Sequence, residues 1–94
     1  MFDKMKQLQQ MKEQMDAAKA RLDTISVKGE CQGISVVANG NKKFLEVQIP
    51  EGMETEEIAE LIVIATNKAI ENAESVFESE MRGMAGGLMG GLGF

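Results

Sequence analysis

The sequence predicts one α+β domain in the order helix, three strands, helix, with a three-stranded antiparallel meander flanked by two long helices. Three observations support this prediction. The first 25 residues have the apolar spacing of a helix, the next 24 alternate as strands do, and a second helical pattern follows the only proline, Pro50. A total of 94 residues is the size of a single domain.

The first predicted helix runs from Phe2 to about Ile25, a segment without glycine or proline. Its apolar residues follow the a/d spacing of a coiled coil. They are Met1, Leu8, Met15 and Leu22, with Met11, Ala18 and Ile25 in the companion register. This narrow apolar stripe favours packing against one other helix.

The apolar pattern then changes to a period of two, which is typical of strands. We predict three strands, over residues 26–31, 34–38 and 43–49. Asn39-Gly40 predicts a tight hairpin turn between the last two strands, because Asn and Gly tolerate positive φ. Gly29 and Gly33 are interpreted as turn residues as well, since neither belongs to a phosphate-binding loop.

The second predicted helix begins at Thr55, which is the expected N-cap, and has apolar residues at intervals of three and four. Its unbroken apolar run, Leu61–Ile64, predicts burial on more than one side of the helix. Gly83 predicts the helix end near residue 82. We therefore expect a domain of residues 1–82 and a flexible, glycine-rich tail of residues 83–94.

The composition argues against an enzyme. Histidine, tryptophan and tyrosine do not occur, and Cys31 is the only cysteine, so the sequence has no His-based catalysis, no Cys/His nucleophile pair and no ordinary zinc site. We expect no catalytic residue, metal, cofactor or small-molecule substrate. The unpaired cysteine and the charges spread through the first residues predict a cytoplasmic protein without a membrane partner.

Charge is unevenly distributed along the chain, although the formal net charge is −5. Residues 1–45 hold eight basic and five acidic side chains, whereas residues 46–94 hold two basic and ten acidic ones. This asymmetry indicates a polarised binding surface, although solvation of the helix faces explains the same charges. The side chains expected to contact DNA phosphates are Lys4, Lys6, Lys12, Lys19, Arg21, Lys28, Lys42 and Lys43.

A homodimer is expected because a chain of this length buries only a modest core. A helix of about 24 residues spans roughly 36 Å, longer than the roughly 32 Å diameter of a compact chain of this length. The helices must then project as arms, or a second subunit must cover them. We expect the dimer interface to include Val36, Val47, Ile49, Leu61 and Ile62.

The order of these features resembles the YbaB/EbfC family of bacterial nucleoid-associated proteins. The resemblance rests on VKGECQGISVVANG, FLEVQIP and TNKAIENAE, between a Met/Gln/Lys-rich helix and a glycine-rich tail. It implies a tweezer-like dimer that joins through its sheet and whose helices form arms that engage DNA. It also implies location in the nucleoid and a role in nucleoid organisation or gene regulation.

Two functions therefore follow as hypotheses. The first is phosphate-directed binding of duplex DNA by a homodimer, since the basic residues have no interleaved aromatic residues on which single strands stack. The second is a homodimeric interaction module that recruits a protein partner through the exposed helix stripe or the apolar tail. Binding to a membrane surface is less well supported, because acidic residues interrupt the basic face and the apolar stripe is narrow.

Overall fold

The structure is a computed structural model that describes the backbone of residues 2–91 and the side chains of residues 4–84. Its elements are, in chain order, α1 (Phe2–Asp23), β1 (Ser26–Cys31), β2 (Ile34–Asn39), β3 (Phe44–Gln48) and α2 (Thr55–Gly91). The three strands form one antiparallel sheet in the order β1-β2-β3. The predicted fold class is confirmed, and so is the predicted start of the second helix.

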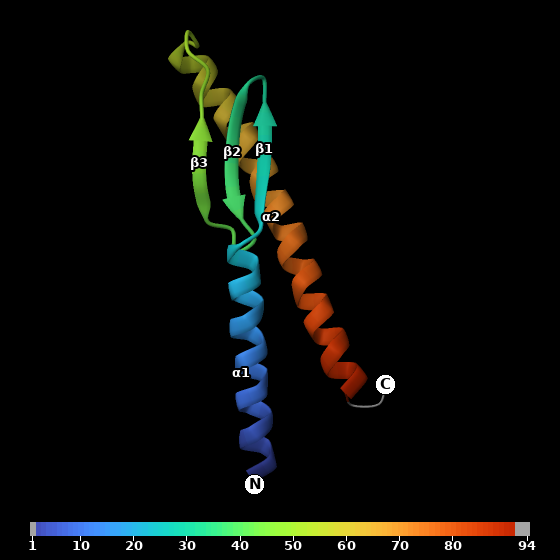
Figure 1. Cartoon of the computed structure of the whole chain (residues 1–94). Coiled ribbons are helices and arrows are strands. Elements are labelled where there is room, and N and C mark those ends of the chain that lie inside the picture. Colours follow the sequence, from blue (N-terminus) through green and yellow to red (C-terminus); the bar gives the residue numbers. More distant parts are fainter. Residues whose placement is uncertain (1, 92–94) are drawn as a thin grey trace.

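The molecule is elongated. It measures 64 × 21 × 16 Å and has a radius of gyration of 18.5 Å, against about 12 Å for a compact chain of this length. α1 and the C-terminal half of α2 leave the same end of the sheet and diverge toward the two chain ends (Figure 1). We call α1 and residues 74–91 of α2 the two arms. Of the two expected alternatives, projection of the helices is seen in the single chain, whereas coverage by a second subunit stays a prediction.

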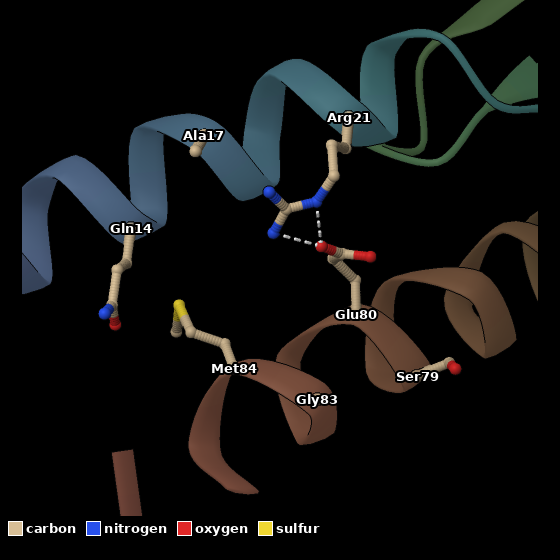
Figure 2. Close-up of a pocket in the computed structure, with 7 residues that line it drawn as sticks. All are labelled: Gln14, Ala17, Arg21, Ser79, Glu80, Gly83 and Met84. Atoms are coloured by element: carbon tan, nitrogen blue, oxygen red, sulfur yellow. Dashed lines mark hydrogen bonds and ion pairs between the residues drawn. The ribbon is translucent and has the colours of Figure 1, made fainter. Parts of the chain in front are cut away.

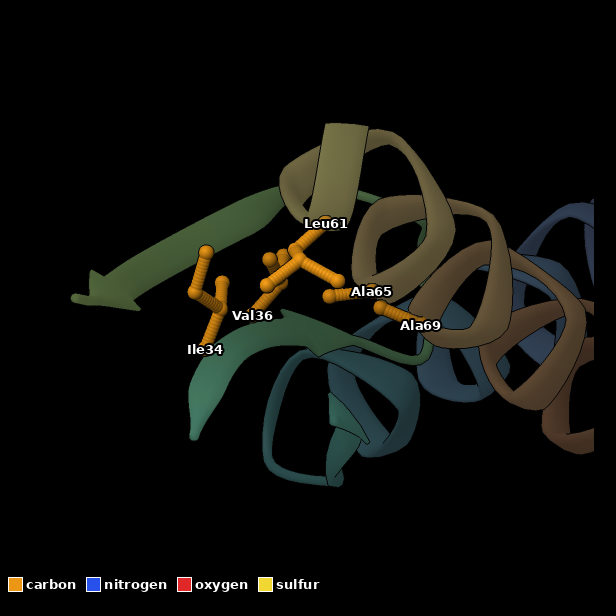
Figure 3. Close-up of a cluster of buried hydrophobic side chains, with 5 residues drawn as sticks. All are labelled: Ile34, Val36, Leu61, Ala65 and Ala69. Carbon is orange, nitrogen blue, oxygen red and sulfur yellow. The ribbon is translucent and has the colours of Figure 1, made fainter. Parts of the chain in front are cut away.

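The core lies between α2 and the sheet (Figure 3). Ile34 and Val36 of β2 pack against Leu61, Ala65 and Ala69 of α2, and all five are buried. α2 covers β1 and β2, whereas β3 is exposed along its whole length. The face of β3 that lies on the same side of the sheet as the core is therefore exposed to solvent.

Gly29 lies inside β1, opposite Val36, so its interpretation as a turn residue is wrong. The strand passes so close to α2 that a Cβ atom at this position would lie less than 3.0 Å from the Ala65 carbonyl oxygen and the Ala69 amide nitrogen. Glycine and alanine therefore set the distance between the strand and the helix. The tight turn of the first hairpin is at Gln32 and Gly33, whose φ values are 48° and 93°.

α2 continues as a helix to Gly91, so its predicted end near residue 82 is wrong. A glycine costs a helix about 1 kcal/mol relative to alanine but does not break its hydrogen bonds, and Met, Ala and Leu between the glycines favour helix. Residues 92–94 lie outside the described residues. The flexibility of residues 83–94 stays a prediction.

Deleting residues 84–94 should leave the melting temperature nearly unchanged, because the core around Val36 and Ala65 lies far up the chain from the deleted segment. Thermal unfolding followed by circular dichroism would measure the effect. For a domain of this size a change of 1 kcal/mol corresponds to about 4–8 °C. A decrease in melting temperature of more than about 8 °C would mean that the end of α2 packs against the sheet, α1 or a neighbouring subunit.

Candidate nucleic-acid interface

The loop between β2 and β3 is held by the side chain of Asn39. This side chain is only 5% exposed, and its Oδ1 accepts hydrogen bonds from the amide nitrogens of Asn41 (2.9 Å) and Lys43 (3.1 Å). The predicted positive-φ turn at Asn39-Gly40 is wrong, because the residue with positive φ is Lys42, at 67°. A buried asparagine thus replaces the tight turn with a longer, fixed loop.

The same loop is fastened to the end of α1. The amide of Gly40 donates to the Leu22 carbonyl at 2.9 Å, and Asn41 Nδ2 donates to the Lys19 carbonyl at 3.0 Å and to the Asp23 carboxylate. Leu22 is fully buried, and a Cβ at Gly40 would lie 2.7 Å from its Cδ2 atom. These contacts fix the backbone of Lys42 and Lys43 beside Lys19.

All eight basic residues predicted to contact DNA are exposed, but they do not form one cluster. The backbone of the loop that carries Lys42 and Lys43 is joined to the end of α1 that carries Lys19. Lys12 lies about two turns from Lys19 along α1. The remaining lysines are separate: Lys4 and Lys6 lie near the far end of α1, and Lys28 lies on β1, 3.4 Å from Glu30.

Two of these cations contact α2. Both Nε and Nη2 of Arg21 lie 2.5 Å from Glu80 Oε1, which ties the arms together (Figure 2). The ammonium of Lys42 lies 4.7 Å from the centre of the Phe77 ring. Glu80 therefore competes with a phosphate for Arg21. No pattern in the sequence predicts this contact, because the two residues are 59 positions apart.

The five predicted interface residues divide into two groups. Val36 and Leu61 are 1% and 7% exposed because they belong to the chain's own core, and Ile62 packs against that core. Val47 and Ile49 are 46% and 44% exposed. Further exposed apolar side chains, which the predicted set omitted, lie on β3 or on α2: Phe44, Leu45, Val63 and Ile64.

Comparison with known proteins gives consistent matches over most of the chain. A nucleoid-associated protein of Chlorobaculum tepidum is 37% identical over 91 residues, which cover 93% of this chain and 82% of the relative. One of Chlorobium phaeobacteroides is 36% identical over 91 residues, covering 93% and 82%. One of Clostridium kluyveri is 33% identical over 90 residues, covering 89% and 79%.

None of the helices, as far as the structure describes them, is long and apolar enough to cross a membrane. The model of the YbaB/EbfC DNA-binding family matches residues 1–88, which include both helices and the whole sheet. The chain therefore belongs to the YbaB/EbfC DNA-binding family.

Proposed function

We propose that this protein binds duplex DNA as a homodimer, mainly through backbone phosphates, and is associated with the nucleoid. The observation that carries the proposal is the loop fixed beside α1, which attaches the backbone of Lys42 and Lys43 to the end of α1 that carries Lys19. Family membership and the nucleoid-associated relatives support it. The role we assign is nucleoid organisation or local gene regulation.

Lysine chemistry supports phosphate contacts over base readout. An ammonium is a flexible point charge, whereas specific base contacts most often use the planar fork of arginine. Arg21 is the only arginine among the expected contacts, and it is engaged by Glu80. Sequence preference should therefore be slight.

The dimer proposal rests on β3. This strand is an edge of the sheet, and the side chains of Val47 and Ile49 lie uncovered near it. An exposed apolar edge strand invites pairing with another chain. Val63 and Ile64 of α2 are also exposed, which leaves the run Leu61–Ile64 only half buried in one subunit. A second copy that extends the sheet would cover these residues and double the basic surface.

The DNA contact predicts a measurable salt dependence. If a dimer places about four to six lysines on phosphates, log affinity should fall against log salt with a slope of roughly −4 to −5. Gel shifts or fluorescence anisotropy on a duplex would give this slope. Each change of Lys12, Lys19, Lys42 or Lys43 to alanine should reduce it by about one. Arg21→Ala should reduce it less, because Glu80 already engages this side chain.

Charge reversal gives the stricter test. Lys12→Glu with Lys19→Glu should abolish most binding, whereas Lys68→Glu with Arg82→Glu makes the same charge change on α2 and should have a smaller effect. We expect wild-type affinity in the micromolar range or weaker at physiological salt, since the glutamates of α2 repel phosphates. Unchanged affinity in the first variant, or no binding by wild type at low salt, would contradict the DNA proposal.

A second candidate function is a protein-interaction module. It is favoured by the exposed apolar side chains of α1, which are Met5, Leu8, Met11 and Met15. Methionine packs adaptably and is frequent at surfaces that accept varied helical partners. Salt-dependent retention on heparin would favour DNA binding, whereas its absence, together with no gel shift, would favour this alternative.

A further inference from the structure

The apolar stripe of α1 continues past the part of the helix that is buried. Ala18 and Leu22 are fully buried at the end of α1 nearest the sheet. Leu8, Met11 and Met15 follow the same spacing toward the N-terminus but are 65%, 45% and 44% exposed. The stripe therefore runs about two further turns along the arm without a partner.

α2 of the same chain does not cover this stripe. The side of α1 that borders the cleft of about 340 Å³ between the arms is formed by Gln14, Ala17 and Arg21 (Figure 2). These positions each precede a stripe position by one residue, which places them about 100° round the helix. The exposed part of the stripe therefore lies beside the cleft and not within it, where an occupant from outside the subunit can cover it.

The arm of α2 has a matching apolar edge. Phe77, Glu78, Met81 and Arg82 line a shallow groove of about 400 Å³, mostly apolar, on a side of α2 other than the one that meets α1. Both apolar segments start at the same loop, since Leu22 packs under Gly40 and Phe77 lies under the ammonium of Lys42. From there they run down the two arms.

The charges beside the two segments are complementary. Lys12 and Lys19 flank the stripe on α1 with Asp16 between them. The groove on α2 is lined by Glu78 and Arg82 with Glu74 one turn before Glu78, so the net charges of the two segments are opposite. Pairing two α1 helices antiparallel would bring lysines together, whereas pairing α1 with α2 of another copy brings lysine to glutamate. Each chain therefore carries two complementary surfaces, the α1 stripe and the α2 groove, which do not contact each other within the chain.

We propose that the arms of a second copy of this chain occupy this face, with the α1 stripe of each copy against the Phe77–Met81 groove of the other. The contact is reciprocal, so one two-fold axis satisfies both halves. It does not involve the β3 edge or DNA. We expect this contact to be weak and to form at high local concentration.

The test uses two charge-reversed proteins in a Val47→Asp background, which removes contacts through β3. One carries Lys12→Glu with Lys19→Glu, and the other carries Glu74→Lys with Glu78→Lys. Each alone places like charges across the interface and should associate at least about five-fold more weakly than its parent. A 1:1 mixture restores opposite charges at every contact and should associate about as well as the parent. Sedimentation velocity without DNA, at protein concentrations on the order of 100 μM, would measure this.

A mixture that associates no better than its separate components would overturn the proposal. The protein with all four changes should also regain association, which shows that the double variants fail through charge and not through misfolding. Because DNA is left out, failure of this test and failure of the DNA proposal are separate results.

Disulfide capture locates the contact. Cys31→Ala proteins carrying Met15→Cys and Met81→Cys, mixed under oxidising conditions, should form a mixed disulfide, which must join two copies. Gln9→Cys in place of Met15→Cys moves the thiol about 120° round α1, off the stripe, and should give several-fold less product. Equal yields from the two mixtures would overturn the proposal.

Discussion

Gly29→Ala is expected to lower the free energy of unfolding by about 3 kcal/mol or more, a large effect for one methyl group. The added Cβ would meet the backbone of α2 at Ala65 and Ala69. Backbone atoms cannot change rotamer to make room, so β1 and α2 would have to separate. Their separation would open the core formed by Val36 and Leu61. Urea denaturation followed by circular dichroism would measure the loss.

Gly83→Ala is the matched control, since it adds the same methyl group to a helical position with nothing within 4 Å. It should raise stability by up to about 1 kcal/mol, because alanine loses less backbone entropy than glycine. Two variants with similar stability would mean that the strand and helix are not in close contact at Gly29.

Regular spacing predicted the elements well. The a/d pattern of α1 and the alternation of the strands are local signals, because each repeats along one face of its element. The predicted strand at residues 26–31 and the helix start at Thr55 agree with the structure. Packing between distant segments was less predictable. At Gly29 the sequence suggested a turn, because nothing near it in the chain indicates that a helix 36 residues away touches its backbone.

The candidate site also depends on contacts between residues that are far apart in the sequence. Lys19, Lys42 and Lys43 were predicted from charge alone, but only the folded chain shows that Asn41 joins the loop to α1. The ion pair of Arg21 with Glu80 had no local pattern to predict it. Val36 and Leu61 were expected at a subunit interface because they are apolar, and apolar character alone does not separate a core side chain from an interface one.

Val47→Asp is expected to separate the subunits while leaving each one folded. Val47 is 46% exposed in the single chain, so an aspartate there stays hydrated in the monomer. In a dimer joined at β3 the same carboxylate would be buried twice about the two-fold axis. A buried, unpaired charge costs several kcal/mol, which raises the dissociation constant at least about 100-fold. Sedimentation equilibrium at micromolar concentration should change from dimer to monomer.

Gln48→Asp is the matched control, because it adds the same charge one residue away on the opposite, polar face of the sheet. There the Gln48 side chain already lies 3.3 Å from the Glu46 carboxylate and faces solvent. This variant should remain largely dimeric, whereas Val36→Asp, at a site only 1% exposed, should unfold the chain. The three substitutions separate an interface position, a surface position and a core position on adjacent strands. If wild type were monomeric at micromolar concentration, or if Val47→Asp left the dimer intact, β3 would not be the dimer interface.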